Sequence, residues 1–210
     1  MPTPLTMPLF PLSTVLYPGG VLHLQIFEVR YLDLMRRCLR EGTPFGVVSL
    51  LDGAEVRNPL ERVNLAGIGT LAEIKHCEAI SPTLLKIHAV GTQRFKLNAY
   101  EQQKAGLWVG EIETLDEEQT VQVPEHLQTS ADTLDHVIKS IEEQGRSPDE
   151  LPFKPPYLLN DCGWVSNRWC EILPLEKSTR LQLLGLDNPL LRLELVNDIL
   201  VEKGISSGIN

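Results

Sequence analysis

The chain has 210 residues, of which 42% are hydrophobic and 22% are charged. This balance is typical of a folded globular protein and excludes a wholly disordered or fibrous chain. The formal net charge of −9 opposes a broad nucleic-acid-binding surface, because phosphate backbones are also negative. The sequence has neither an apolar run of membrane-spanning length nor the basic segment and cleavage site of a signal peptide, so we expect a cytoplasmic protein with no membrane partner.

Residues 8–123 are predicted to form mostly β-strands. Leu22, Leu24 and Ile26 alternate with polar residues, which is the pattern of a strand with one buried face. Pro11 should lie at a sheet edge or a strand end, because proline has no N–H to donate. The short segment 91–93 contains Gly91 and is typical of a hairpin between antiparallel strands. The predicted strands cover residues 9–12, 21–27, 45–51, 67–78, 83–90, 94–100 and 107–115, which together indicate a barrel or a curled sheet.

One helix is predicted inside this β-rich region, from Glu28 to Glu41. Its apolar residues recur at helical spacing, and Gly42 follows as a stop signal, so we expect the helix to cover an open end or a face of the sheet. The opposite side of the helix carries the densest basic cluster of the chain. That cluster comprises Arg30, Arg36, Arg37 and Arg40, and we interpret it as a solvated helix face.

Residues 124–210 change to the periodicity of helices. The predicted helices cover residues 124–144, 157–173, 174–184 and 190–202. Asn188 before Pro189 is a strong start signal for the last of them, because an Asn side chain caps free N–H groups and proline suits the first helical turn. The expected fold is therefore α+β, with a β-barrel subdomain at residues 1–123 and a helical subdomain at residues 124–210.

Motifs for nucleophilic catalysis and nucleotide binding are missing from the sequence. Ser49 lies in a predicted strand and lacks the strand–turn–helix context of a nucleophile elbow. No phosphate-binding P-loop occurs, and the segment Gly67-Ile68-Gly69 is better explained as a strand bulge than as part of a dinucleotide motif. Spacing alone does not exclude a Ser–Lys dyad. The pattern nevertheless favours a binding or scaffolding protein without catalytic residues or a cofactor over an enzyme.

A metal site is not expected either. His76 and Cys77 are adjacent on a predicted strand and so face opposite sides, while the other histidines are scattered. The carboxylate pairs Glu117-Glu118 and Glu142-Glu143 lie in polar stretches, where solvation explains them. The cysteines fall in apolar segments without short paired spacing, and we expect reduced thiols in the core at Cys38, Cys77, Cys162 and Cys170.

Short motifs occur in a definite order along the chain. The segment from Met7 to Tyr31 combines a short apolar strand, a P-G turn, a second apolar strand and an R-Y pair that opens a helix. The residues concerned are Phe10-Pro11-Leu12, Pro18-Gly19, Ile26-Phe27-Glu28, Arg30-Tyr31, Phe45-Gly46-Val47-Val48, Gly69-Thr70-Leu71-Ala72, Gly91-Thr92-Gln93-Arg94-Phe95 and the run from Leu173-Pro174 to Pro189-Leu190. In number, order and spacing they resemble the N-terminal domain of Lon proteases (peptidase S16) over nearly the whole chain.

The resemblance implies a PUA-like β-barrel with one crossing helix, followed by a C-terminal helical bundle. It also implies a role in binding polypeptides. The Lon ATPase and Ser–Lys protease motifs are not seen, so we expect a stand-alone, non-catalytic recognition or adaptor module. Its expected partners are unfolded or tagged polypeptides, with a protease or chaperone as a cooperating protein. Two alternatives stay open, a PUA-like RNA-binding module, which the acidic charge disfavours, and a small-molecule-binding protein; the oligomeric state is left undetermined.

Six residues are candidates for a peptide-binding surface. Strand edges of a small barrel can accept an extended peptide through backbone hydrogen bonds, and aromatic side chains can supply contact area. The candidates are Phe27, Arg30, Tyr31, Arg94, Phe95 and Trp108. For the aromatic residues the competing interpretation is core packing. The two arginines could bind a carboxylate or fix the helix to the barrel, and Arg30 has a ready structural partner in Glu28.

Overall fold

A computed structural model describes residues 5–53, 55, 63–143 and 154–205. The chain divides into two compact units, Met1–Glu117 and Glu118–Asn210. The change of periodicity expected at residue 124 thus lies a short way into the second unit. Together the described residues form an α+β fold with one six-stranded sheet and five α-helices, and none of these helices has the length and apolar character needed to cross a membrane.

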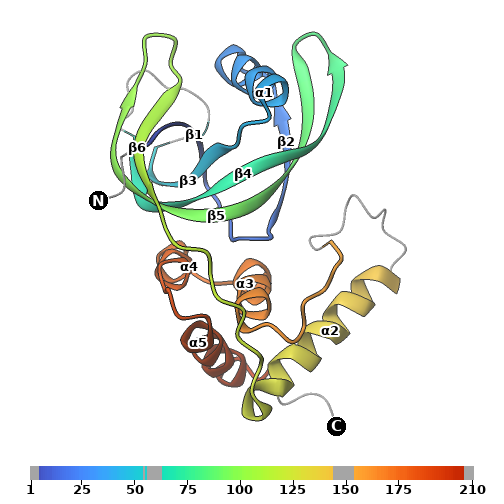
Figure 1. The fold of residues 1–210 in the computed structure, drawn as a ribbon. Coiled ribbons are helices and arrows are strands. Elements are labelled where there is room, and N and C mark those ends of the chain that lie inside the picture. The colour runs from blue at the N-terminus through green and yellow to red at the C-terminus, as the bar shows by residue number, and fades with distance from the viewer. Residues whose placement is uncertain (1–4, 54, 56–62, 144–153, 206–210) are drawn as a thin grey trace. The chain divides into compact units, whose positions relative to one another are not determined.

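The first unit is built on a sheet whose pairings return on themselves. Its strands are β1 (Leu5–Leu12), β2 (Val21–Ile26), β3 (Phe45–Asp52), β4 (Asn64–Ser81), β5 (Leu84–Gln102) and β6 (Trp108–Thr114). The strand order is β2-β5-β4-β3-β1-β6, and β6 also pairs with β5. Five strands therefore form a ring of pairings, and β2 lies outside it, next to β5 (Figure 1). The β1–β3 pair is parallel and the others are antiparallel.

The predicted hairpin at residues 91–93 is wrong, because β5 runs through this segment as one strand. The chain changes partner here instead of reversing: residues of β5 before Gly91 pair with β2, and residues from Phe95 onward pair with β6. Gly91 serves a close approach, since a Cβ at this position would lie 2.4 Å from the carbonyl oxygen of Tyr17. The glycine therefore leaves room for the segment that contains Tyr17. The chain reverses direction earlier, between Ser81 at the end of β4 and Leu84 at the start of β5.

The helix predicted between the second and third strands is confirmed as α1 (Val29–Glu41). Gly42 ends it in the left-handed conformation, with φ of 63°, and its N–H donates to the carbonyl of Cys38. The buried side of α1 carries Tyr31, Leu32, Leu34, Met35 and Cys38. These residues share one apolar core with Phe10, Phe45 and Ile87 of the sheet, so α1 covers a face of the sheet as its spacing indicates.

Helices make up most of the described second unit. They are η1 (Glu125–Leu127), α2 (Gln128–Glu143), α3 (Cys162–Ile172), α4 (Lys177–Leu184) and α5 (Pro189–Glu202). The helix predicted at residues 124–144 corresponds to η1 and α2, and its predicted end at Gln144 lies outside the described residues. The α3 helix begins later than the predicted residue 157, because the Asp161 side chain caps it by accepting from the Trp164 N–H. Asn188 caps α5 as predicted, accepting from the N–H groups of Leu190 and Leu191.

Candidate functional site

The structure separates the six candidate residues into surface and core. Phe27 is 57% exposed, directly after β2, and Trp108 is half-buried at the start of β6. Tyr31, Arg94 and Phe95 are buried, with Phe95 fully enclosed, so these three side chains offer little or no surface to a bound chain.

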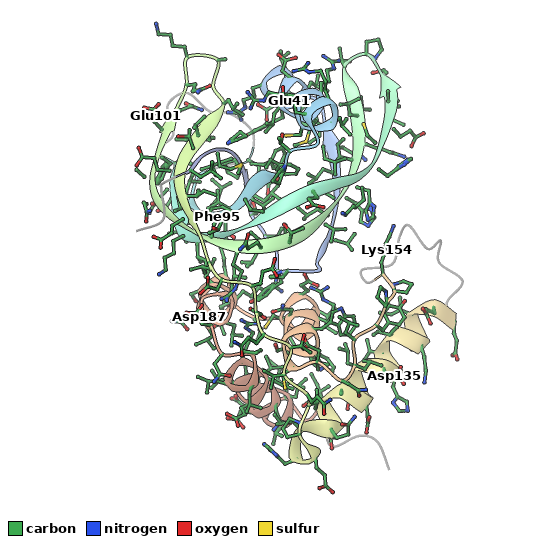
Figure 2. All side chains as sticks on the ribbon, viewed as in Figure 1. Glu41, Phe95, Glu101, Asp135, Lys154 and Asp187 are labelled. Atoms are coloured by element: carbon green, nitrogen blue, oxygen red, sulfur yellow. The ribbon has the colours of Figure 1, made fainter. Side chains whose placement is uncertain are left out.

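Phe95 is the centre of the packing that joins three of the sequence motifs. Figure 2 labels it in the densely packed interior of the first unit. Its ring lies over Gly46 and Gly69, where an added Cβ would come within 3.2 Å and 2.5 Å of the ring edge. The glycines of the F-G-V-V and G-T-x-A motifs therefore leave room for the aromatic residue of the G-x-x-R-F motif. These motif residues build the fold and do not form a binding surface.

Arg30 fixes the start of α1 to the turn between β5 and β6. Its guanidinium lies 3.0 Å from the Glu28 carboxylate and donates a 2.6 Å hydrogen bond to the carbonyl of Gly106. It also lies over the Tyr31 ring, 4.5 Å from the centroid, and only 6% of the Arg30 side chain is exposed. Of the two roles considered for Arg30, these contacts match the structural one. Burial raises the pKa of the Tyr31 phenol to about 12.

Two of the accessible groups of apolar side chains on the first unit include candidate residues; Leu5, Leu39, Leu51 and Ile80 are also exposed, elsewhere on the unit. At the junction of β2 and α1, Phe27 is 57% exposed and Val29 is 72% exposed. On the β5–β6 hairpin, the rings of Tyr100 and Trp108 meet edge to face, 5.8 Å apart, and both are partly exposed. Arg30 lies in the β2–α1 junction and donates a hydrogen bond to the carbonyl of Gly106 in the β5–β6 turn, so the junction and this turn lie next to each other.

The basic side of α1 is smaller than its sequence indicates, since Arg30 turns inward. Arg36, Arg37 and Arg40 are exposed, in agreement with the interpretation of a solvated face. Arg36 pairs with Asp33 at 3.6 Å and donates to the carbonyl of Pro82 in the β4–β5 turn. Arg40 pairs with Glu41. Exposed pairs of this kind contribute little to stability.

Three histidines form a row across neighbouring strands, although they are scattered in the sequence. His23 of β2 lies opposite His88 of β5, which lies opposite His76 of β4. The rings of His23 and His88 stack with centroids 5.0 Å apart. Cross-strand register, which the sequence does not display, creates this row. Within the described ranges no group of three His, Cys, Asp or Glu side chains is arranged to hold a metal ion.

A buried charged cluster lies in the second unit, and the sequence pattern does not reveal it. Arg192 of α5 is fully buried and forms a two-pronged ion pair with Glu118, a residue whose polar surroundings in the sequence predict a solvated carboxylate. Its other N–H groups donate to the side chain of Asn167 and to the carbonyls of Leu183 and Leu186. These five hydrogen bonds use every donor of the guanidinium, so the cluster is a structural junction and not a vacant binding site.

All four cysteines are free thiols, and the expected core position is confirmed for Cys38, Cys162 and Cys170, whereas Cys77 is only partly buried. Burial raises the pKa of the Cys38 and Cys77 thiols. Burial, helped by the negative charge of Asp161, raises the pKa of Cys162 to about 11. Thiols held protonated in this way are poor nucleophiles, so these positions do not resemble activated catalytic cysteines.

Comparison with known proteins then decides the family. The profile of the ATP-dependent protease La (LON) substrate-binding domain matches residues 6–202. The chain belongs to the Lon substrate-binding domain family. A crystal structure of a Lon N-terminal domain protein from Xanthomonas campestris is similar, with 31% sequence identity, a TM-score of 0.72, and coverage of 92% of this chain and 98% of that one.

A second solved structure shares the fold at lower identity. It is the N-terminal domain of the Mycobacterium avium complex Lon protease, with 13% identity, a TM-score of 0.59, and coverage of 98% of this chain and 100% of that one. Among proteins with curated descriptions, none matches the chain significantly. The resemblance stated from the sequence motifs is thus confirmed at the level of the Lon substrate-binding domain family.

Proposed function

We propose that this chain is a polypeptide-recognition module that binds unfolded or tagged protein segments and has no catalytic activity of its own. The observation that carries the proposal is the match of residues 6–202 to a substrate-binding domain family. In this proposal the module works in the cytoplasm as an adaptor that presents bound segments to a protease or a chaperone. In the same proposal, the ring of strands in the first unit is a PUA-like β-barrel and the helices of the second unit form a helical bundle.

The distribution of side chains in the first unit supports this proposal. The motif residues Gly46, Gly69 and Phe95 pack closely in the interior. In this proposal the strand ends and turns at the surface are the parts that contact polypeptides. Exposed apolar side chains on such a frame, here Phe27 and Val29, are suited to contact the apolar residues that unfolded chains present. The binding surface in this proposal therefore centres on Phe27, with Trp108 near it and Arg30 as a positioning residue.

An array of short overlapping peptides from several soluble proteins tests the proposal. We expect the purified chain to bind a subset of peptides rich in apolar residues, and to ignore Gly/Ser-rich controls. Equal signal on all peptides, or none, would overturn the proposal. A parallel incubation with casein and ATP checks the non-catalytic part, which cleavage of casein or hydrolysis of ATP by the purified chain would contradict.

A further inference from the structure

One edge of β2 has no partner strand among the described residues of the first unit. Among the described strands, β2 pairs with β5 alone along its whole length. The other five strands each pair with at least two strands, although the part of β4 after Ala72 pairs with β5 alone. A sheet edge presents unpaired backbone N–H and C=O groups, which act as a template for another strand.

The register of β2 identifies the backbone groups at this edge. The N–H of Gly91 donates to the carbonyl of Gly20, so the bonded positions facing β5 continue at Leu22, Leu24 and Ile26. In an antiparallel pair, bonded and non-bonded positions alternate. The N–H and C=O groups of the residues between them therefore point outward, away from β5, and these residues are Val21, His23 and Gln25.

The edge of β2 lacks three of the features that proteins use to block strand addition, namely proline, charged side chains and bulges. Its sequence, VLHLQI, contains no proline and no charged residue, and its pairing with β5 has no bulge. Natural edge strands are commonly protected by lysine, proline or bulges. An edge without them can accept a strand along its whole length.

We propose that the outward edge of β2 binds an extended segment of an unfolded polypeptide by adding it to the sheet as a further strand. This inference rests on the proposed function and assigns its binding surface.

The chemistry of the occupant follows from the two faces of β2. Leu24 is only partly buried although it packs against the core, so an apolar side chain of the added strand can cover it. On the other face His23 and Gln25 are exposed, which suits polar side chains of the added strand. Phe27 and Val29 extend the apolar contact beyond the end of β2. The occupant is therefore a segment with alternating apolar and polar residues and little charge, the pattern of segments that become β-strands when a protein folds.

A proline substitution at one position of the edge tests this inference. Gln25→Pro removes an outward N–H that β5 does not use, and Gln25→Thr is the matched control that keeps it. The probe is fluorescein-labelled α-lactalbumin, reduced and carbamidomethylated so that it stays unfolded. We expect Gln25→Pro to weaken binding about tenfold and Gln25→Thr less than about twofold, because only proline blocks the backbone contact. Circular dichroism and thermal unfolding check that both variants are folded.

Amide hydrogen exchange of the wild-type protein, read by NMR, gives a second test that needs no variant. On addition of the probe we expect slower exchange at Val21, His23 and Gln25, while Leu22 and Leu24 stay protected in both states. If Gln25→Pro bound the probe as tightly as the wild type, and the exchange rates of the outward amides did not change, the β2 edge would not be the binding site, while the proposed function would stand. Protection that rises with protein concentration without probe would show pairing between copies and overturn the polypeptide as occupant. A wild-type protein that binds no probe would overturn the proposed function and this inference together.

Discussion

The ion pair between Glu118 and Arg192 allows a quantitative test of how the second unit is held together. Substituting Glu118 with Gln keeps the size of the side chain and removes its charge. Arg192 is fully buried, and its guanidinium then keeps a positive charge without the carboxylate that neutralises it. Breaking a buried pair by removing one partner costs about 3–5 kcal/mol. The Glu118 side chain is 15% exposed, so we expect the lower end, about 3 kcal/mol.

Truncation of the arginine should cost more than neutralisation of the glutamate. Arg192→Met removes the charge but leaves the carbonyls of Leu183 and Leu186 and the side chain of Asn167 without their donor. Each unsatisfied buried acceptor costs about 1–3 kcal/mol. The double variant should therefore not recover the stability of the wild type, although removal of both charges makes its loss smaller than the sum of the two single losses.

Urea unfolding followed by tryptophan fluorescence measures these differences, since Trp164 and Trp169 both lie on α3 beside the cluster. Glu117→Gln is the matched control, because Glu117 is exposed one residue away and should lose less than about 0.5 kcal/mol. If Glu118→Gln were as mild as Glu117→Gln, the cluster would not stabilise the unit and the reasoning would be refuted. A double variant whose loss equals the sum of the single losses would refute the coupling.

Three further predictions concern the first unit and one helix cap. Gly69→Ala should destabilise the protein by about 3 kcal/mol, because its Cβ would lie 2.4 Å from the carbonyl of Val47, whereas Gly67→Ala meets no atom within 4 Å and should be nearly neutral. The folded-state pKa of Tyr31 is raised from 10.0 to about 12, so its stabilising contribution is complete below pH 10 and is lost as pH rises toward 12. Between these pH values the free energy of unfolding should fall more steeply for the wild type than for Tyr31→Phe, by up to about 1.4 kcal/mol per pH unit. Asn188→Ala should cost about 1 kcal/mol through loss of the α5 cap.

Chemical denaturation measures the free energy of unfolding for all three predictions, at one pH for the glycine and Asn188 variants and at a series of pH values for Tyr31→Phe. Equal stability of the Gly69→Ala and Gly67→Ala variants would contradict the close packing over Val47. Parallel pH profiles for the wild type and Tyr31→Phe would show that the phenol titrates normally. An unchanged midpoint for Asn188→Ala would mean that the cap contributes nothing to stability.

Local signals in the sequence predicted the local structure well. The apolar spacing of α1 gave its buried side, Gly42 marked its end, and Asn188 marked the start of α5, because each of these features depends on residues within one or two turns. The course of β5 could not be predicted in this way. A glycine in a strand can mark a turn or a close approach, and the atom that decides between them at Gly91 belongs to Tyr17, far away in the chain.

The candidate site shows the same limit of sequence reasoning. Phe27 and Tyr31 are aromatic residues of two adjacent motifs, but the first lies after the end of a strand and the second on the inner side of a helix, so one is exposed and the other buried. The Arg192–Glu118 pair joins residues 74 positions apart, and nothing in either local segment distinguishes these charges from solvated ones. Such contacts depend on tertiary packing, which periodicity does not encode.

Equilibrium binding of an unfolded protein tests the central claim most directly. Fluorescence anisotropy of labelled, reduced and carbamidomethylated α-lactalbumin should rise to saturation as the chain is added in 0.15 M salt, while native α-lactalbumin should give no such rise. A short RNA oligonucleotide should not bind either, given the net charge of −9. Absence of binding to the unfolded protein, equal affinity for its native form, or tighter and strongly salt-dependent binding to RNA would contradict the account.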